Sequence, residues 1–418
     1  MMKKWTRLAL LTAGMGLLVG GLVGCGKKEE SADGKTTIEF FSQKKEMKST
    51  LEEIISDFEK ENPDIKVKLT NVPDAGTVLK TRIASNDIPD VINSYPQNAD
   101  FQEWAKAGIF EDLTGKEYLG NLKEGSAETY AIEDKVYSVP LTSNAWGFFY
   151  NKDAFTELGL ETPKTWAEFE TLVAAIQKAD KVPFAASINT ADSWTLNGYH
   201  QLAWATVTGG YDGAEDALVR SPKGAIKTSN EDFKMVANQL DLLSGTAQKN
   251  ANGATYDDAV ATFAKGEALI FPNGLWALPA VKNQNPTFEI GTFAYPGLKE
   301  NEELTVGAAD LAVSISASSK NKEAAEKFVS YLTTKEAMQK YYDVDGSPTS
   351  VEAVEIENKF PETEGVSQYV FTDKQIVWLQ KEWTSEESFW HATVDYVNSG
   401  DKEQLANSLN SFFDPMKK

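Results

Sequence analysis

The residue whose type and position point most clearly to covalent chemistry is Cys25, the only cysteine in 418 residues. It directly follows Leu22-Val-Gly, which ends an apolar run over 8–24 that begins after a basic segment at 3–7. Such a basic, apolar and small-residue order is typical of an export signal, and the run is shorter than the ~20 residues of a spanning helix. The pattern predicts a lipoprotein signal over 1–24, with Cys25 lipidated on its thiol. An uncleaved anchor with an incidental cysteine is the alternative interpretation.

The rest of the composition excludes several kinds of active site. A single cysteine in an exported chain leaves no internal disulfide, no cysteine zinc site and no other thiol nucleophile. His200 and His391 are the only histidines, so a histidine-rich metal centre is excluded. No nucleophile elbow, phosphate-binding P-loop or dinucleotide fingerprint occurs, and no cofactor is predicted. A glycoside hydrolase needs only two carboxylates, and 62 acidic residues leave that class open.

The chain is acidic, with a formal net charge of −21. Loss of Lys3, Lys4 and Arg7 with the signal would bring this charge to −24. So acidic a body disfavours binding to nucleic acid or anionic lipid through a basic surface. The acidity is explained either by solubility or by an acidic binding face. Residues 25–35 are polar and small, which predicts a flexible tether that follows the lipidated cysteine.

The elements that position any site begin with alternating strands and helices. A strand-like segment at 36–41 precedes a helical apolar pattern from Met47 to Phe58, and alternating apolar residues from Ile65 to Leu69 predict a second strand. A helix over 73–84 and a strand over 88–94 follow. This order predicts an α/β fold with a parallel sheet, whose ligands bind at the carboxyl ends of the strands. Those ends fall at 42–45 and 93–97.

The later segments suggest a second lobe, and a length near 400 residues also favours two lobes over one. Short strands are expected before Pro140 and over 145–150, and Thr165 with Glu168 predicts a capping box at a helix start. Further on we expect a strand over 268–272 with a turn at Asn273-Gly274, then a strand over 311–315 and a helix over 322–332. These late segments resemble those of the first lobe, so the chain is expected to cross between lobes more than once.

Seven motifs in order carry a family resemblance along nearly the whole chain. They are Asp87-Ile-Pro-Asp-Val-Ile-Asn93, Lys135-Val-Tyr-Ser-Val-Pro140, Tyr150-Asn-Lys-Asp-Ala-Phe155, Thr162-Pro-Lys-Thr-Trp-Ala-Glu-Phe169, Phe263-Ala-Lys-Gly-Glu-Ala268, Pro272-Asn-Gly-Leu-Trp276 and Lys322-Glu-Ala-Ala-Glu-Lys-Phe328. With them the chain resembles the extracellular solute-binding lipoproteins of carbohydrate ABC importers. It is more similar to the raffinose and multiple-sugar binding lipoproteins of Gram-positive bacteria than to maltose-binding protein.

The resemblance implies a type II periplasmic-binding-protein-like fold, in which two α/β lobes close over a sugar about a hinge. Carried onto this sequence, it implies a first lobe of 34–142 plus 271–332 and a second lobe of 143–270 plus 333–418. The hinge crossings are expected near Ser143, Ile270 and Thr333.

A sugar presents apolar faces and a rim of hydroxyls, so its site needs aromatic rings and fixed polar groups. The resemblance implies stacking by Trp276, and Trp194 lies in a loop before a helix. Phe371 and Asp373 resemble a loop that holds a terminal galactose, although Lys374 and Gln375 replace a histidine found there in relatives. Trp390 is either a stacking residue or part of the core. The expected polar contacts are Gln43, Lys44, Asn93, Asn144 and Asp310.

The resemblance therefore implies a lipid-anchored extracellular protein, expected to be a monomer, that captures an oligosaccharide and delivers it to the permease of an ABC importer. Raffinose-type α-galactosides, isomalto-oligosaccharides and fructo-oligosaccharides all remain possible ligands. The alternatives from other classes are a secreted glycoside hydrolase and an adhesin without a small ligand.

Overall fold

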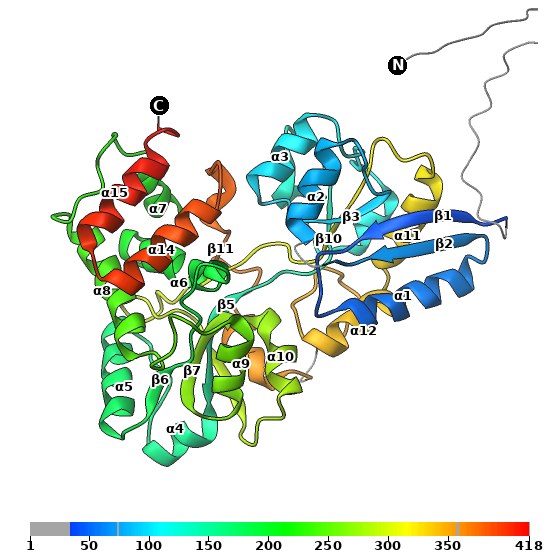
Figure 1. Cartoon of the computed structure of the whole chain (residues 1–418). Helices are drawn as coiled ribbons and strands as arrows, with labels where there is room; N and C mark the ends of the chain where they lie inside the picture. Colours follow the sequence, from blue (N-terminus) through cyan, green and yellow to red (C-terminus); the bar gives the residue numbers. More distant parts are fainter. Residues whose placement is uncertain (1–33, 73–74, 357–358, 418) are drawn as a thin grey trace, which may run out of the picture.

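The computed structural model describes residues 34–72, 75–356 and 359–417. The predicted signal over 1–24 and the lipidated Cys25 lie outside the described residues. Figure 1 shows two lobes that lie side by side and are joined by several segments of the chain. Each lobe has its own sheet, covered by helices, so the predicted α/β fold with two lobes is confirmed.

The sheet of the first lobe has the strand order β2-β1-β3-β10-β4. The strands β1 and β2 pair in parallel over their full length, and β3 continues the parallel set on the other side of β1. The strand β10 returns from much later in the chain and pairs antiparallel with both β3 and β4. The bounds are β1 Thr36–Phe41, β2 Ile65–Thr70, β3 Val91–Ser94, β4 Val139–Pro140 and β10 Ala312–Ile315.

Amphipathic helices cover this sheet because their apolar residues recur on one face. In α1, Leu51, Ile54 and Phe58 are buried, and the ring of Phe58 lies 5.1 Å from that of Phe328 in α11. The ring of Phe328 also packs on Phe40 of β1 at 5.4 Å. Helices from both ends of the chain therefore share one core. The bounds are α1 Lys48–Glu61, α2 Ala75–Ala84, α3 Ala99–Lys106, α11 Lys322–Leu332 and α12 Lys335–Asp345.

The sheet of the second lobe has the strand order β6-β7-β5-β8. Its central strands β5 and β7 pair antiparallel, and every residue of β7 is buried. The predicted turn at Asn273-Gly274 is wrong, because β7 continues through both residues while it pairs with β5. The bounds are β5 Trp146–Asn151, β6 Val182–Phe184, β7 Ala268–Gly274 and β8 Ile290–Phe293.

The core of the second lobe is rich in aromatic rings. Trp146 of β5 is 1% exposed and lies 6.0 Å, ring to ring, from Tyr199 of α6. Gly198 allows this approach, since a Cβ there would lie 2.4 Å from the Trp146 ring. The helices that surround the core are α4 Lys152–Leu158, α5 Trp166–Lys178, α6 Asn197–Thr208, α7 Tyr211–Leu218, α8 Glu231–Thr246, α9 Tyr256–Ala264, α10 Leu278–Asn283, α13 Glu364–Ser367, α14 Glu387–Ser399 and α15 Lys402–Phe413.

Side chains at helix starts behave largely as the sequence predicts. The Asn151 side chain accepts a hydrogen bond from Ala154 N at the start of α4. Thr165 caps α5 by accepting from Glu168 N at 3.3 Å. The Glu168 carboxylate accepts from Lys164 N at 2.7 Å, one residue before the position that a full capping box uses. The predicted box is therefore formed only in part.

The lobe boundaries differ from those expected in two of three places. The crossing at 142–145 lies between β4 and β5 as predicted. The crossing expected near Ile270 is wrong, because β7 and β8 belong to the second sheet and the chain returns to the first only before β10. The crossing expected near Thr333 is also wrong, since Met338 and Val351 pack in the core of the first lobe. The chain next joins the second lobe at the 3-10 helix η5, Pro361–Thr363, which packs on β8 together with α13.

Two short strands complete the connection between the lobes. The strand β9, Thr305–Val306, pairs in parallel with β11, Gln375–Ile376. Short 3-10 helices are η1 Glu117–Asn121, η2 Glu128–Tyr130, η3 Ser193–Leu196, η4 Leu275–Ala277, η5 Pro361–Thr363 and η6 Leu379–Glu382.

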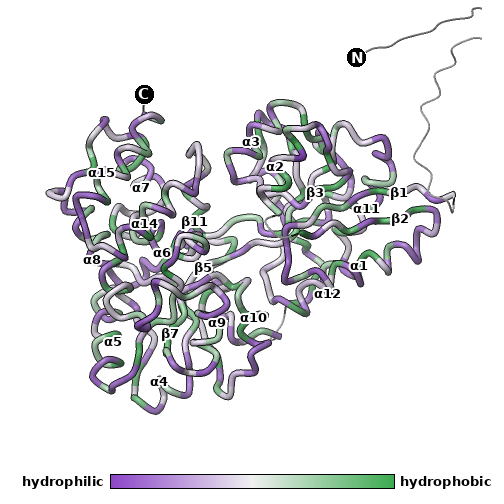
Figure 2. The backbone as a smooth tube through the Cα atoms, in the orientation of Figure 1, coloured by the Kyte–Doolittle hydropathy of each residue, from purple (hydrophilic) through white to green (hydrophobic). Residues whose placement is uncertain are grey.

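Figure 2 shows hydrophilic residues along the outer helices of both lobes. In the described part of the chain, we find no helix with the length and apolar character needed to cross a membrane.

Candidate functional site

A cavity of about 460 Å³ is lined by residues of both lobes and of the crossings between them. Its volume lies within the range of sites that bind small molecules. Aromatic side chains make up much of its wall. These are Tyr95, Phe101, Trp104, Phe110, Trp194, Trp276, Trp378 and Trp390. The polar lining includes Gln43, Lys44, Gln97, Asn98, Asn144, Asn197, Asp310, Gln380 and Glu386.

The cavity meets the sheet of the first lobe where its parallel strands end. Gln43 and Lys44 follow β1, and Tyr95 to Asn98 follow β3. The carboxyl ends of neighbouring parallel strands share one edge, so the loops after β1 and β3 converge there. The predicted ligand edge at 42–45 and 93–97 therefore lies at the cavity.

A buried ion pair stands at the base of the cavity. Lys44 Nζ lies 2.7 Å from Asp310 Oδ2 and 2.7 Å from a carboxylate oxygen of Glu46. Burial alone would lower the pKa of Lys44, but the carboxylates of Asp310 and Glu46 outweigh it and raise this pKa well above its ordinary value. Lys44 therefore stays charged, and its charge is balanced within the protein.

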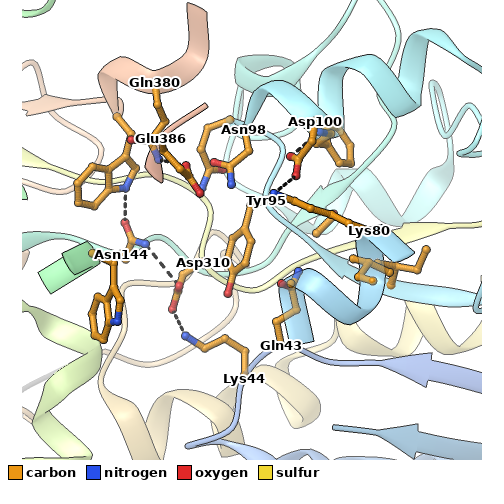
Figure 3. Close-up of a pocket in the computed structure, with 18 of the residues that line it drawn as sticks. Gln43, Lys44, Lys80, Tyr95, Asn98, Asp100, Asn144, Asp310, Gln380 and Glu386 are labelled. Carbon is orange, nitrogen blue, oxygen red and sulfur yellow. Dashed lines mark hydrogen bonds and ion pairs between the residues drawn. The ribbon is translucent and has the colours of Figure 1, made fainter. Parts of the chain in front are cut away.

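The ion pair continues as a chain of hydrogen bonds into the second lobe (Figure 3). Asn144 Nδ2 donates to Asp310 Oδ1 at 3.4 Å, and Asn144 Oδ1 accepts from the Trp378 indole N–H at 3.3 Å. Asn144 Oδ1 also accepts from Ala308 N at 2.8 Å. This chain links Lys44 in the first lobe to Trp378 in the second, across two of the crossings.

Gln43 and Asn93 are bound to each other. Gln43 N donates to Asn93 Oδ1 at 3.1 Å, and Gln43 Nε2 donates to Asn93 O at 2.9 Å. Asn93 Nδ2 donates to Ala312 O at 3.2 Å in the neighbouring strand. Asn93 is fully buried and does not belong to the lining, so the structure gives it a supporting position behind Gln43 instead of the expected ligand contact.

The predicted tryptophans lie in the cavity wall of the second lobe. Trp276, in η4 directly after β7, rests on Gly274, where a Cβ would lie 1.9 Å from its ring. Trp194 packs against Tyr256 with 5.1 Å between ring centroids. Trp390 of α14 also lines the cavity, which favours the first of its two interpretations.

The structure does not bring Phe371 and Asp373 to this cavity. Phe371 is 47% exposed and Asp373 is exposed. Phe371 lines a second cavity of about 300 Å³ together with Ser143, and the Lys123 ammonium lies 4.7 Å from the centre of its ring. Thr142 and Ser143 line the second cavity and Asn144 lines the first, so this crossing separates the two cavities.

Several lining residues were not predicted from the sequence. Gln97 lies within 93–97, the strand end at which ligands were expected to bind, so the sequence did indicate its neighbourhood. Asn197 and Glu386 lie three and four residues from the candidates Trp194 and Trp390, but their own types gave no separate signal, and nothing in the sequence pointed to Gln380. Trp378 comes two residues after β11. The sequence did not predict the pairing of β11 with β9 that brings Trp378 to the cavity.

Some polar atoms at the cavity have no partner within the described residues. They are Gln97 Oε1, Asn98 Oδ1 and Trp390 Nε1, all buried. An unsatisfied buried polar group costs about 1 to 3 kcal/mol, so a bound polar molecule or water that pairs with these atoms is favoured. The described residues contain no cluster of His, Cys, Asp or Glu that could hold a metal ion.

Comparison with known proteins defines the class. The family described as bacterial extracellular solute-binding protein matches residues 42–339, more than half of the chain. The chain belongs to this family. The family consists of binding proteins, which favours binding over the glycoside hydrolase and the adhesin.

The similar proteins include well matched relatives. The chain is 52% identical, over 99% of its length and 99% of the relative, to the multiple sugar-binding protein of Streptococcus mutans. The structure described as the solute-binding protein RafE in complex with raffinose matches with a TM-score of 0.88 and 53% identity, over 91% of this chain and all of that one. The apo form of RafE from Streptococcus pneumoniae matches with a TM-score of 0.82 and 54% identity, over 91% of this chain and 98% of that one. The fold is the type II periplasmic-binding-protein-like fold of these proteins.

Proposed function

We propose that this extracellular protein captures an oligosaccharide in the cavity between its lobes and delivers it to the permease of an ABC importer. The lining of the cavity between the lobes is the observation that carries the proposal. Tryptophans at Trp194, Trp276, Trp378 and Trp390 surround polar groups from both lobes. Such a wall offers flat apolar surfaces for sugar rings and donors and acceptors for hydroxyl groups.

The polar groups are suited to hydroxyl recognition because they are held in place before a ligand arrives. Lys44, Asp310 and Asn144 are each less than a tenth exposed and bound to one another. A fixed donor or acceptor binds a matching hydroxyl without first losing conformational freedom. A micromolar site needs about −8 kcal/mol, which two stacked rings and several hydrogen bonds can supply.

The names of the relatives favour raffinose-type α-galactosides as the first ligands to test. Isomalto-oligosaccharides and fructo-oligosaccharides stay in the proposal because an aromatic wall accepts any flat sugar face. The proposal includes a lipid anchor on Cys25 and a monomeric protein that hands its cargo to the importer. Closure of the lobes about the crossings at 142–145 and 306–310 would distinguish the loaded from the empty protein.

The proposal is tested with the soluble chain, residues 26–418, in a thermal-shift screen. The ligands are raffinose, stachyose, melibiose, isomaltotriose, maltotriose, kestose and a peptide mixture. A ligand that binds only the folded state raises the melting temperature by mass action. A shift of several degrees with one sugar series supports the proposal and names the cargo class, whereas no shift with any sugar contradicts it.

The hydrolase alternative is tested with the same protein. Asp100 and Glu386 place carboxylates in the cavity, one from each lobe, so an acid pair is present in principle. Overnight incubation with raffinose or isomaltotriose, followed by chromatography, is expected to return the sugar intact. Release of monosaccharide at a rate above that of a Glu386→Gln variant would overturn the assignment as a binding protein.

A further inference from the structure

A carboxylate and an indole lie next to each other on the cavity face of α14. Glu386 precedes the helix as its N-cap residue, and Trp390 follows four residues later. Residues four apart lie on the same face of a helix, one turn from each other. Both side chains line the cavity, and the buried Trp390 Nε1 has no partner within the described part of the chain. An aromatic ring next to a carboxylate was expected at Phe371 and Asp373. Glu386 and Trp390 provide such a combination inside the cavity instead.

A buried amide behind this pair has a fixed orientation. Gln201 of α6 is fully buried, and its Oε1 accepts from the backbone N–H of Leu379 at 2.7 Å. A backbone N–H is only a donor, so the other end of the Gln201 amide must be its NH₂ group. That group donates to Asn197 Oδ1 at 2.7 Å and to Gln380 Oε1 at 2.7 Å.

The fixed orientation is passed on to Glu386. Since Gln380 Oε1 accepts from Gln201, the opposite end of Gln380 is its donor, and it donates to Glu386 Oε2 at 2.8 Å. An ionised carboxylate accepts about four hydrogen bonds, so one bond from Gln380 leaves acceptor capacity for a ligand. Figure 3 shows Gln380 and Glu386 adjacent at the cavity. The Glu386 carboxylate is therefore held from behind.

The charges that face Glu386 come from its own helix and from the other lobe. Glu387 is its neighbour in α14, and Asp100 of α3 and Lys80 of α2 lie in the first lobe, with Lys80 Nζ 3.2 Å from Asp100 Oδ2. Burial, together with the charges of Asp100 and Glu387, raises the pKa of Glu386 to about 7, against the opposing effect of Lys80. A ligand that donates hydroxyl hydrogens to the carboxylate favours its ionised form.

We propose that Glu386 and Trp390 form a specificity-determining subsite for one pyranose ring of the oligosaccharide, and that Gln201 is the positioning residue that orients Glu386 through Gln380. The ring stacks on the indole, and two neighbouring hydroxyl groups donate to the carboxylate. This inference rests on the proposed function and adds to it the residues that read a sugar's hydroxyl pattern. An epimer that turns one hydroxyl away would leave part of the carboxylate unpaired, which is costly in a buried site.

Calorimetric titration of the soluble chain with raffinose, and in parallel with isomaltotriose, tests the subsite. We expect Glu386→Gln to weaken binding at least about tenfold, because hydrogen bonds to a charged group are worth more than neutral ones. The wild type should bind more tightly as the pH rises from 6 to 8, and the variant should lose this dependence. Glu387→Gln is the matched control, since it removes the exposed neighbouring carboxylate. It should keep the affinity at pH 8 and still bind more tightly as the pH rises, with the midpoint of the profile slightly lower because Glu387 no longer raises the pKa of Glu386.

The positioning role is tested with Gln201→Met, which keeps the length of the side chain but removes the amide. Gln380 Oε1 then keeps only the longer bond from Asn197 Nδ2 at 3.3 Å, and Asn197 itself loses its bond from Gln201. The affinity should therefore fall about fivefold or more, and the midpoint of the pH profile should rise. In a Glu386→Gln background the same substitution should add little. Gln380→Leu removes the relay next to the carboxylate and provides a second route if Gln201→Met fails to fold.

Each part of the inference has its own contradictory outcome. Unchanged affinity in Glu386→Gln, with sugar binding intact in the wild type, would remove the subsite and leave the proposed function standing. A lower melting temperature in Gln201→Met, with unchanged affinity and pH midpoint, would make Gln201 purely structural. Absence of binding by the wild type to every sugar would instead overturn the proposed function.

Discussion

At the scale of single residues, the indole of Trp276 depends on the absence of a side chain below it. Gly274 ends β7, and its Cα hydrogen faces the ring that lines the cavity. Any Cβ at this position would lie about where the ring now is, since the nearest distance would be 1.9 Å. The glycine therefore sets the depth and the angle at which the tryptophan meets a ligand.

Removal of the Trp276 ring should weaken sugar binding without unfolding the protein. We expect Trp276→Ala to cost more than ~1 kcal/mol of binding free energy, in line with buried aromatic anchors elsewhere. Calorimetry measures the affinity, and circular dichroism checks the fold. Phe371→Ala is the control, because its exposed ring lies outside this cavity, and it should bind as the wild type does. Equal affinity in Trp276→Ala would remove Trp276 from the site.

A methyl group at position 274 should act through the same ring. Gly274→Ala keeps Trp276 in the chain but displaces it, so the affinity should fall by an amount comparable to the loss in Trp276→Ala. In the Trp276→Ala background, where no ring is left to displace, the added methyl should have little further effect on binding. Additive losses in the double variant would show that Gly274→Ala acts elsewhere, through the pairing of β7 with β5.

The sequence predicted much of this site, and the exceptions have physical causes. Gln43, Lys44 and Asn144 could be placed because each follows a recognisable strand or crossing. Phe371 was misplaced because its loop lies on the opposite face of the hinge, and periodicity gives no sign of which face a connecting loop takes. Glu386 was missed because its importance comes from Gln201, 185 positions earlier, and long-range pairing leaves no local pattern.

At the scale of elements, strands and helices with strong local signals were predicted well. The strand β1 and the helix α11 have the bounds that their patterns indicate, Thr36–Phe41 and Lys322–Leu332. The sheet to which β7 belongs could not be predicted, because a fully apolar strand suits the centre of either sheet. Partner choice depends on contacts between residues far apart in the sequence, such as the strand pairing of Trp146 with Gly274.

The helix α6 carries a histidine whose neutral form the fold requires. His200 is fully buried, accepts from the Trp204 indole N–H at 3.1 Å and stacks on Phe389 at 4.3 Å. Its other ring nitrogen lies 2.7 Å from Thr393 Oγ1 in α14. Burial lowers the pKa of His200 to about 3. The ring joins two helices and should remain uncharged across the physiological range.

Acid should destabilise the protein partly through this residue. Below pH ~6.5 the unfolded chain binds a proton at His200 that the folded chain refuses, so stability falls as the pH drops towards 3. Between pH 7.5 and 5 this loss amounts to about 2 kcal/mol. Urea unfolding of the wild type and of His200→Gln should show their difference in stability shrinking by that amount at pH 5. His391→Gln, which removes the exposed histidine, is the control. A constant difference between the two proteins would contradict the assignment.

At the scale of the whole molecule, the two lobes are joined by the crossings at 142–145 and 306–310, which pair with each other and present different residues on their two faces. Ser143 pairs with Ala309, while Asn144 and Asp310 line the first cavity. The Lys44 to Trp378 chain of contacts runs across these crossings, so a ligand that bonds to any of its members also touches the hinge. Binding and lobe movement are therefore expected to be coupled through Asn144 and Asp310.

Loss of one charge at the hinge should cost both stability and binding. Asp310→Asn leaves Lys44 buried with Glu46 as its remaining carboxylate partner among the contacts described above. Removal of one partner of a buried ion pair typically costs about 3 to 5 kcal/mol. Urea unfolding should show a loss of that order, reduced here by Glu46, and Lys44→Met combined with Asp310→Asn should recover part of it. No recovery in the double variant would mean that Lys44 and Asp310 do not act as a pair.

Sugar binding should bring the lobes together, and this chain is convenient for measuring it. Because Cys25 is the only cysteine, the soluble chain from residue 26 has none. Spin labels will therefore react only with cysteines introduced at chosen positions. Lys106 on α3 and Asn407 on α15 are exposed positions on different lobes. Pulsed electron paramagnetic resonance on the Lys106→Cys, Asn407→Cys double variant should give a shorter distance between the two spin labels when raffinose is added. The reason is that the ligand binds the closed state more tightly.

The matched control places both labels on one lobe. Lys68→Cys with Lys106→Cys lies entirely within the first lobe, and its distance should not change with sugar. The Glu386→Gln variant adds a second comparison, since it weakens the contact from the second lobe and should need more raffinose to reach the same shortened distance. An unchanged distance between the lobes at saturating raffinose, with binding confirmed by calorimetry, would show that this protein holds its ligand without closing, and that the importer must recognise the loaded form through the sugar itself.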